Sequence, residues 1–497
     1  MLLVDQLSHM AAHHPDEIAY VDLVGSDDLT FQQWESGANR LARELVARGV
    51  RPGDRVALYL ESSHVLRWIQ SYAAIHRCGA VAVPINTRLT APELSSILAH
   101  AAPVAAITSA TLVPILDAAR PASVRIRFLA DSEWESIATL DDSSIQPPIT
   151  DDDLADIMYT SGTTGLPKGI AVRHRQTHII PAGAPAWTGD AWLVGSPLFT
   201  FAGLSFVYNP MKMGMRCLYQ SRFDASAWIQ TVETERPVCA FVVPSMAQLI
   251  TLEERFDSAD LSSISMLSIG SAPLPPSLHA RLAARLTNAT VSNSYSMTEA
   301  GTAFTYMPPG ELERHPGSVG IPMGTEIRIA GDDGEPLPPG EIGEILIGVG
   351  EDHREYYNDP DATAATWSGP WLRSGDLGTL DAEGYLSIVG RKKDVIIRGG
   401  NNVHAADVES VLYTHPAILE AAVVGVPHDI LGEDIGAAIV VRPHMTLTAA
   451  EVVAFCRERL ADYRSPRRIW FIDELPRNPT GKVVKRDLVP PEQRGPT

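Results

Sequence analysis

The sequence has few cysteines and no arrangement that would join them. Four occur in 497 residues, at Cys78, Cys217, Cys239 and Cys456, far apart and without a CxxC pair. This excludes a disulfide framework, which needs closely grouped cysteines in an oxidising compartment. We therefore expect reduced thiols and a cytoplasmic location.

Long apolar runs and excess positive charge are also absent. No segment approaches the roughly eighteen apolar residues of a membrane span, and the N-terminal MLLVDQLSHMAAHHPDE lacks a basic region followed by an apolar one. The formal net charge of −20 disfavours broad contact with nucleic acid or anionic lipid, because like charges repel. We expect a soluble, unprocessed protein that binds any anionic ligand through local positive side chains.

Metal-ligand motifs are missing as well. His174, His178 and His404 lie outside any HExxH-type spacing, and a lone histidine is usually structural or solvated. No transition-metal site is predicted.

What the sequence does contain is a regular alternation of helical and strand patterns. At 497 residues the chain exceeds the size at which one core keeps growing, so we expect at least two domains. The helix-spaced WESGANRLARELVARGV is followed by apolar runs that predict strands, at RVALYL (55–60), AVAVPI (80–85), FLA (128–130), CAFVVP (239–244) and SMLSIG (265–270). This rhythm predicts an α/β fold of layered sheets covered by helices.

The pattern changes twice toward the C-terminus. Between Gly317 and Gly390 apolar residues alternate with period two, and Gly and Pro mark the turns, which predicts a small β-rich subdomain. The order strand, helix, strand, strand, helix, strand then predicts an α+β domain of about one hundred residues. We expect a large domain over residues 1–391 and a small one over residues 392–497.

One short stretch concentrates small and hydroxyl residues. YTSGTTGLPKG (159–169) is not a Walker loop, because Lys168 follows Pro167 and a predicted strand, GIAV, comes next instead of a helix. Its backbone N–H groups and hydroxyls can form a nest around a polyphosphate, with Lys168 adding a positive charge. The alternative is an ordinary Gly/Thr-rich surface loop.

This stretch resembles the signature of the adenylate-forming enzymes, the superfamily of acyl-CoA synthetases, luciferases and peptide-synthetase adenylation domains. Four further segments are similar to motifs of that family in their usual order: SNSYSMTEAG (292–301), WLRSGDLG (371–378), GYLSIVGRKKD (384–394) and RNPTGK (477–482). The resemblance runs from about residue 5 to residue 488. It implies the family's fold, in which the small C-terminal domain is mobile.

The resemblance also implies roles for matching residues of the large domain. Tyr295 would stack on adenine and Thr298 would bind phosphate. Glu299, with Thr160, would hold Mg²⁺, a hard cation suited to oxygen ligands. Asp376 would accept hydrogen bonds from both ribose hydroxyls. The implied nucleotide-binding set is Thr160, Ser161, Gly162, Thr163, Thr164, Gly165, Lys168, Ser271, Ala272, Ser294, Tyr295, Ser296, Met297, Thr298, Asp376, Arg391 and Lys482.

The small domain and its junction complete the implied site. Arg391 would lie at the nucleotide, Lys393 at the hinge, and Lys482 between the carboxylate and the α-phosphate. Gly399 and Gly400 suit close passage of the pantetheine arm of CoA. Taken one at a time, such residues also have structural readings: Asp376 could cap a turn, Glu299 could be a solvated charge, and Lys482 could sit on a mobile tail.

The implied reaction joins two anions, a carboxylate and the α-phosphate of ATP, so catalysis must be electrostatic and positional. Lys168, Glu299 and Lys482 would be its catalytic residues. The resemblance implies an AMP-forming acyl-CoA synthetase that uses ATP, Mg²⁺ and CoA and releases pyrophosphate. Two alternatives stay open: delivery of the acyl group to a carrier protein or an amine, and a non-catalytic nucleotide-binding protein. The partners are then a carboxylic acid, ATP and CoA, with a homodimer or a carrier protein left open.

The acid itself is less defined. SPLFTFAG (196–203) aligns with a family segment that commonly has histidine where Thr200 stands, and packing or specificity explains threonine equally well. We place the acyl pocket at Thr200, Phe201, Gly203 and Gly270. In amino-acid-activating relatives an aspartate binds the α-amino group at the place that SPLFTFAG fills here. Asp224 in FDAS (223–226) comes later in the chain, so an α-amino acid substrate is disfavoured. An apolar or aromatic acid is favoured, with an adaptable pocket drawn from Phe201, Phe206, Tyr208, Met211, Met213 and Met215 or, as an alternative, these residues in the core.

Overall fold

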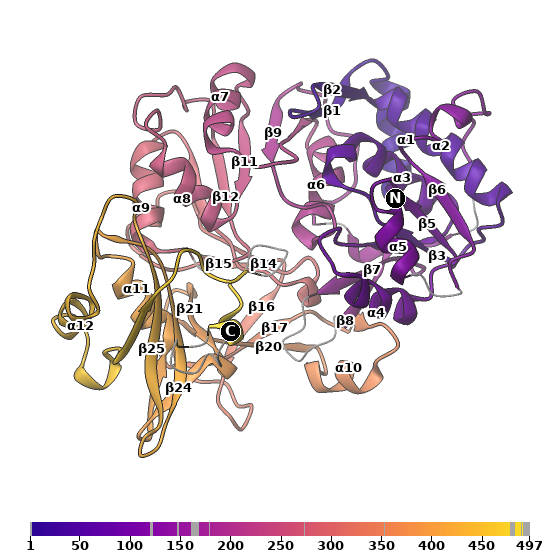
Figure 1. Cartoon of the computed structure of the whole chain (residues 1–497). Coiled ribbons are helices and arrows are strands. Elements are labelled where there is room, and N and C mark those ends of the chain that lie inside the picture. The colour runs from indigo at the N-terminus through magenta and orange to yellow at the C-terminus, as the bar shows by residue number, and fades with distance from the viewer. Residues whose placement is uncertain are drawn as a thin grey trace.

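The computed structural model in Figure 1 describes most of the chain: residues 2–119, 123–146, 149–160, 168–177, 179–272, 274–351, 353–477, 483–488 and 490. Six residues of the predicted site lie outside these ranges: Ser161, Gly162, Thr163, Thr164, Gly165 and Lys482.

Two seven-stranded sheets form the bulk of the large domain. In spatial order the first contains β13 (Thr290–Asn293), β12 (Met266–Ile269), β11 (Cys239–Val242), β9 (Ala191–Val194), β10 (Arg216–Tyr219), β1 (Ile18–Asp22) and β2 (Asp27–Thr30). The second contains β18 (Glu355–Tyr356), β8 (Lys168–Arg173), β7 (Leu154–Thr160), β4 (Val81–Pro84), β3 (Arg55–Leu58), β5 (Ala105–Thr108) and β6 (Ile126–Leu129). Every residue of β4, β5 and β9 is buried, as expected for parallel strands covered on both faces.

Helices lie between the two sheets and cover their outer faces (Figure 1). The helices that share one apolar core with both sheets are α1 (Leu3–His13), α2 (Phe31–Ala47), α3 (Val65–Arg77) and α6 (Phe201–Lys212). The helices of the outer faces are α7 (Ala225–Glu235), α8 (Pro244–Leu252) and α9 (Pro276–Arg285) on the first sheet, and α4 (Ala91–Ala101) and α5 (Val113–Ala119) on the second. The predicted layered α/β fold is confirmed.

Local sequence signals fix the start and the packing of α2. The Thr30 hydroxyl accepts the Gln33 N–H at 3.2 Å, and the Gln33 side chain accepts the Thr30 N–H at 2.9 Å, which forms a capping box. One turn on, the buried Trp34 indole donates to the Ile69 carbonyl of α3 at 3.2 Å. The indole N–H is thereby satisfied while its ring fills the core between the sheets.

The β-rich subdomain also follows the sequence pattern. Its main sheet contains β16 (Glu326–Ala330), β17 (Gly343–Gly348), β20 (Trp371–Leu380), β19 (Trp367–Ser368) and β21 (Leu386–Arg391). Beside it lie the paired strands β14 (Phe304–Tyr306) and β15 (Ile321–Met323) and the short helix α10 (Pro360–Thr366).

The C-terminal part forms a second five-stranded sheet, with two helices on one face. Its elements are β22 (Val395–Arg398), β23 (Asn401–His404), α11 (Ala405–Leu412), β24 (Ile418–His428), β25 (Gly432–Val441), α12 (Ala449–Arg457) and β26 (Arg468–Phe471). The sequence pattern predicts all of them except β23, whose Asn401 and Asn402 give no apolar signal. Val408 and Leu412 of α11 are fully buried and belong to the apolar core of this part.

Two expected absences can be compared with the structure. Cys78, Cys217, Cys239 and Cys456 are all free and buried, so no disulfide involves them. Over the described ranges, no helix combines the length and the apolarity needed to cross a bilayer.

We predict that Gly320→Ala destabilises the fold through a backbone clash. Gly320 has φ of +90°, and a Cβ there would lie 2.1 Å from the Tyr306 carbonyl oxygen of β14. Clash and left-handed strain together should cost about 3 kcal/mol and lower Tm by several degrees. The control is Gly310→Ala, with φ of +81° and nothing within 4 Å of its Cβ. If both variants melt at the same temperature, the proposed clash is wrong.

Candidate functional site

The glycine- and hydroxyl-rich stretch is bounded by an antiparallel pair of strands. Thr160 is the last residue of β7, Lys168 is the first of β8, and the two are partners in the ladder. A strand therefore follows the stretch, as predicted. Because no helix begins there, a phosphate would gain nothing from a helix N-terminus, and Lys168 must supply the positive charge.

Lys168 and Glu299 share an aromatic neighbour that the sequence analysis missed. The Lys168 ammonium lies 4.7 Å from the ring centroid of Tyr356 in β18, within cation–π range. The Tyr356 hydroxyl donates to Glu299 Oε1 at 3.3 Å. Burial raises the pKa of Tyr356, and the Glu299 charge raises it further. Tyr356 is therefore neutral, and it contacts both the Lys168 ammonium and the Glu299 carboxylate.

Asp376 gathers two other predicted residues. Its Oδ2 accepts the Tyr295 hydroxyl at 2.7 Å, and its Oδ1 lies 3.3 Å from Arg391 Nε. Asp376 and Arg391 are also partners in the β20–β21 ladder. Burial raises the pKa of Tyr295 well above its usual range, and the Asp376 charge adds to the rise. The structure thus brings Tyr295, Asp376 and Arg391 together, and their roles at a nucleotide stay predictions.

The segment that follows β13 joins these two groups. It carries Tyr295 at one end and Glu299 at the other. Ser296 occupies a position where the family usually has glycine, yet it pairs with Phe304 and donates its hydroxyl to the Ala303 carbonyl at 3.0 Å. Serine therefore fits the extended backbone there. Met297 packs against the β-rich core, and Thr298 begins the 3-10 turn η4 (Thr298–Ala300).

The predicted residues after β12 lie at the carboxyl edge of the first sheet. Gly270 follows β12, and its Cβ would meet the Ser294 carbonyl at 3.3 Å. Ser271 has φ of +72°, a strained value for a residue with a side chain, and Ala272 comes next. The Ser294 N–H donates to the Ile269 carbonyl at 2.9 Å. Strain of this kind concentrates at ligand sites, which supports the assignment of this edge.

The junction with the C-terminal part lies close to Asp376. Lys393 sits in η5 (Lys392–Asp394), between β21 and β22. Burial lowers the pKa of Lys393, and the positive charges of Arg391 and Arg486 lower it further. Arg486 belongs to η7 (Lys485–Asp487), so the C-terminal segment lies near the junction.

Two contacts anchor this C-terminal segment to its own domain. Lys485 Nζ lies 2.8 Å from Oε1 of Glu409 in α11, and Leu488 is buried in an apolar cluster that includes Trp470. Burial raises the pKa of Glu409, and the Lys485 charge acts in the opposite direction. Lys485 and Leu488 are therefore held against this domain, while Lys482 itself lies outside the described residues.

The glycine pair predicted to face CoA has a structural explanation of its own. Gly399 and Gly400 form the two-residue turn between β22 and β23, with φ of +56° and +82°. Positive φ at both central positions is typical of tight hairpin turns and favours glycine. The CoA-binding role stays a prediction.

Thr200 proves to be a helix cap. Its hydroxyl accepts the Gly203 N–H at 3.0 Å at the start of α6 and donates to the Pro197 carbonyl at 2.7 Å. A Cβ on Gly203 would lie 2.0 Å from that same carbonyl, so glycine is required for packing. Asp224 likewise caps α7 by accepting the Ala227 N–H at 2.8 Å.

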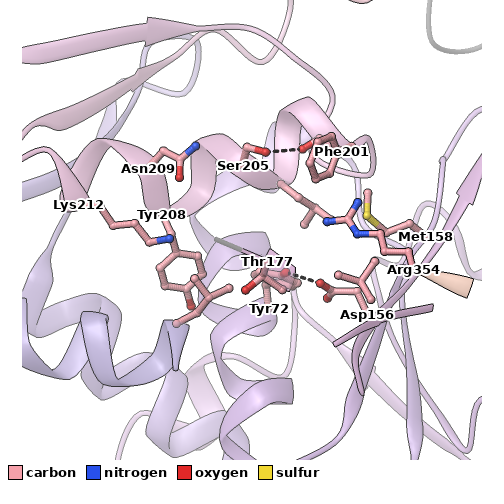
Figure 2. Close-up of a pocket in the computed structure, with 13 residues that line it drawn as sticks. Tyr72, Asp156, Met158, Thr177, Phe201, Ser205, Tyr208, Asn209, Lys212 and Arg354 are labelled. Carbon is pink, nitrogen blue, oxygen red and sulfur yellow. Dashed lines mark hydrogen bonds between the residues drawn. The ribbon is translucent and has the colours of Figure 1, made fainter. Parts of the chain in front are cut away.

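A small cavity of about 20 Å³ lies beside α6, between the two sheets (Figure 2). Phe201 and Tyr208 line it as predicted. Phe206 and Met211 are buried in the core instead, Met213 is 45% exposed, and Met215 packs against the core. Met211, Met213 and Met215 therefore do not line this cavity, and for Met211 and Met215 the alternative of a place in or against the core applies.

Polar side chains line much of the cavity wall, and the sequence analysis assigned none of them. They are Tyr72, Asp156, Thr177, Ser205, Asn209, Lys212 and Arg354. Asp156 accepts the Tyr72 hydroxyl at 3.0 Å. These residues come from five separate segments and carry no short motif, so only packing reveals that they share one space.

Arg354 connects the cavity to the segment that carries Glu299. It is 2% exposed, donates to the Gln176 carbonyl at 2.7 Å and to the Thr298 carbonyl, and lies 4.7 Å from the Phe201 ring. Burial lowers the pKa of Arg354 to about 10, and the charges of Asp156 and Glu299 oppose this shift. The guanidinium stays charged at neutral pH and orients the residues around it.

Two family models and several known proteins match this chain. Residues 7–357 match the family model described as AMP-binding enzyme, and residues 407–482 match the AMP-binding enzyme C-terminal domain. A feruloyl-CoA synthase from Amycolatopsis sp is 36% identical over 471 residues, covering 93% of this chain and 94% of the relative. The long-chain-fatty-acid–CoA ligase FadD13 of Mycobacterium tuberculosis is 36% identical over 497 residues, covering 97% of each.

Solved structures agree with these matches. The anthranilate CoA ligase AuaEII, determined with anthranoyl-AMP, superposes with a TM-score of 0.88 and 28% identity, covering 98% of this chain and 96% of that one.

We predict that Arg354→Met lowers stability through lost backbone contacts. The buried carbonyls of Gln176 and Thr298 would lose their charged hydrogen-bond donor. This loss should lower the free energy of unfolding by about 3 kcal/mol and lower Tm by several degrees in a thermal melt. The control is Arg328→Met, which removes a half-exposed arginine paired with Glu326 and should change stability by less than about 0.5 kcal/mol. Equal melting temperatures for the two variants would contradict the structural role of Arg354.

Proposed function

The chain belongs to the AMP-binding enzyme family, and from that premise we propose that it is an ATP-dependent acid–CoA ligase. It would convert a carboxylic acid and ATP to an acyl-adenylate and pyrophosphate. It would then transfer the acyl group to CoA with release of AMP. The family membership makes it an enzyme, while the acid and the acceptor are part of the proposal.

One observation carries the proposal. A single short segment, from Tyr295 to Glu299, joins the Asp376 group to the Lys168 group. A nucleoside bound at Asp376 and a phosphate bound at Lys168 would thus belong to one ligand. ATP carries a nucleoside and phosphates in one molecule, and these two groups of residues would each bind one of those parts.

The nucleoside end matches the chemistry of Asp376. Its carboxylate is largely buried and already accepts from Tyr295 and faces Arg391. The two oxygens of a carboxylate match the two adjacent hydroxyls of a ribose, each of which can donate a hydrogen bond. The Tyr295 ring, fixed through its hydroxyl, would present a face to adenine.

The phosphate end has the residues to hold Mg²⁺. Glu299 Oε2 accepts no hydrogen bond from the residues that the structure describes, and the Thr160 hydroxyl is the second oxygen donor proposed. No group of three or more acidic, histidine or cysteine side chains forms a metal cage within the described ranges. That fits Mg²⁺, which is commonly held by one or two carboxylates together with substrate phosphates. When bound, the ion would neutralise phosphate charge.

In the first step a carboxylate oxygen of the acid forms a bond to the α-phosphorus, and the bond from that phosphorus to the bridging oxygen breaks. Pyrophosphate leaves with the electron pair. Lys168 would stabilise the leaving pyrophosphate, and Lys482 would bridge the acid and the α-phosphate. No proton transfer is needed, so positioning and charge carry the catalysis.

In the second step the CoA thiol gives up its proton and its sulfur forms a bond to the acyl carbon. The bond from that carbon to the phosphate oxygen breaks, and AMP leaves with the electron pair. We place the domain boundary between residues 391 and 392, where β21 ends and η5 begins, with Lys393 as the hinge. Rotation there would withdraw Lys482 and bring the turn of Gly399 and Gly400 toward the acyl-adenylate. We place the reaction in the cytoplasm, where ATP and CoA are available.

The reaction itself is the third prediction. Pyrophosphate release should depend on an added acid, and CoA should raise turnover while a thioester accumulates. Lys482→Met should lower acid-dependent pyrophosphate release by about 100-fold, because the charge between the two anions is lost. It should still transfer the acyl group from a supplied acyl-adenylate to CoA. If a carrier protein or an amine accelerates turnover and CoA does not, the acceptor in this proposal is wrong.

The fourth prediction concerns Lys485 as a positioning residue for Lys482. Lys485→Met removes the 2.8 Å ion pair with Glu409 and loosens the segment that follows Lys482. Adenylation should fall by about tenfold, since small misplacements of a catalytic group are costly. Transfer from a supplied acyl-adenylate should change by less than about twofold, because Lys482 takes no part in it.

Two further variants make the test of Lys485 specific. Glu409→Gln should reproduce the loss in adenylation with the second step intact. Arg459→Met, an exposed change on the same domain, should affect neither step. Equal losses in both steps for Lys485→Met would indicate general damage to the domain and overturn the positioning role.

A further inference from the structure

The side chain of Tyr356 contacts two opposite charges at two different points. The Lys168 ammonium lies over the face of its ring, 4.7 Å from the centroid, and its hydroxyl donates to Glu299 Oε1 at 3.3 Å. Lys168 and Glu299 both belong to the described residues, and no ion pair joins these two side chains. Each charge is therefore held by a different part of the tyrosine, the ammonium by the ring and the carboxylate by the hydroxyl.

A direct ion pair between Lys168 and Glu299 would be the simpler arrangement. Both side chains are partly buried, and opposite charges about 4 Å apart near a protein surface attract by about 4 kcal/mol. Such a pair would occupy the very charges that a nucleotide needs, because the ammonium would face a carboxylate instead of a phosphate. The carboxylate would likewise be neutralised before a divalent cation could reach it.

The position of the Tyr356 ring is fixed by contacts other than these two charges. In β18 Tyr356 is the ladder partner of Ile170 in β8, and its backbone N–H donates to Thr363 Oγ1 in α10 at 3.0 Å. Its ring meets that of Trp367 edge to face, with the centroids 5.4 Å apart and the planes at 67°. The tyrosine is therefore a fixed surface against which the two charged side chains lie.

From this geometry we propose that Tyr356 is a positioning residue that keeps Lys168 and Glu299 apart, so that the ammonium remains available to phosphate and the carboxylate to a divalent cation. The proposal rests on the proposed function, because it assigns a role within that same site. The two parts of the side chain act separately. The ring holds the ammonium, and the hydroxyl engages Oε1 of Glu299 and leaves Oε2 for the cation.

The test of the ring measures ATP binding by calorimetry without any acid, so that no turnover occurs, and with EDTA in place of Mg²⁺. Tyr356→Leu removes the ring and lets Lys168 pair with Glu299, so ATP affinity should fall about threefold to tenfold. Glu299→Gln removes the competing carboxylate. The gain in ATP affinity from Glu299→Gln should be at least about threefold larger in Tyr356→Leu than in the wild type. Equal gains in the two backgrounds would overturn the separating role.

The test of the hydroxyl repeats the measurement with Mg²⁺. Tyr356→Phe keeps the ring, so ATP affinity in EDTA should stay within about twofold of the wild type, while the extra affinity that Mg²⁺ adds should fall about threefold to tenfold. An unchanged effect of Mg²⁺ would contradict the role of the hydroxyl. The matched control is Tyr357→Phe, because the Tyr357 ring packs against another apolar cluster and its hydroxyl donates to none of the described residues. This variant should change neither affinity.

The outcomes separate this proposal from the proposed function. If the wild type binds ATP but no acid releases pyrophosphate, the proposed function fails, and the binding comparisons still decide the role of Tyr356. If the wild type binds no ATP, the nucleotide site is wrong and the role of Tyr356 fails with it. Thermal melts show whether each variant is folded, and Tyr356→Met replaces Tyr356→Leu if the latter is unfolded.

Discussion

The buried carboxylate of Asp376 connects three parts of the chain. It lies in the β-rich sheet, accepts the Tyr295 hydroxyl from the edge of the first large sheet, and faces Arg391 at the last residue before the C-terminal part. A buried carboxylate is stable only when donors surround it. The positions of Tyr295 and Arg391 are therefore tied to one another. The same carboxylate is the proposed partner of the ribose, so the structural joint and the nucleotide site coincide.

The protein must bring anions together although its own charge is −20. Long-range attraction cannot do this, because the overall field repels a polyphosphate. The structure places single cations at defined points instead: Lys168 against the Tyr356 ring, Arg354 behind the Thr298 segment, and Lys212 at the end of the cavity. Each lies in a partly or fully buried place, where a charge acts strongly over a few ångströms and is weakly screened by salt. Single cations at defined points would thus attract the anions that the negative net charge repels.

One helix lines the cavity along its length. The first turn of α6 is capped by Thr200 and presents Phe201 toward Arg354. The last turn presents Asn209 and Lys212 to the same cavity. A rigid helix fixes the separation of these side chains.

The sequence by itself determined the layered α/β fold and the strand after the glycine-rich stretch. Both follow from local periodicity along the chain. Only the tertiary structure decided that Tyr295, Asp376 and Arg391 meet, that Tyr356 lies against Lys168, and that Lys212 and Arg354 line one cavity. The physical reason is that such contacts join distant segments, and their geometry depends on how helices and sheets pack rather than on any short stretch of residues.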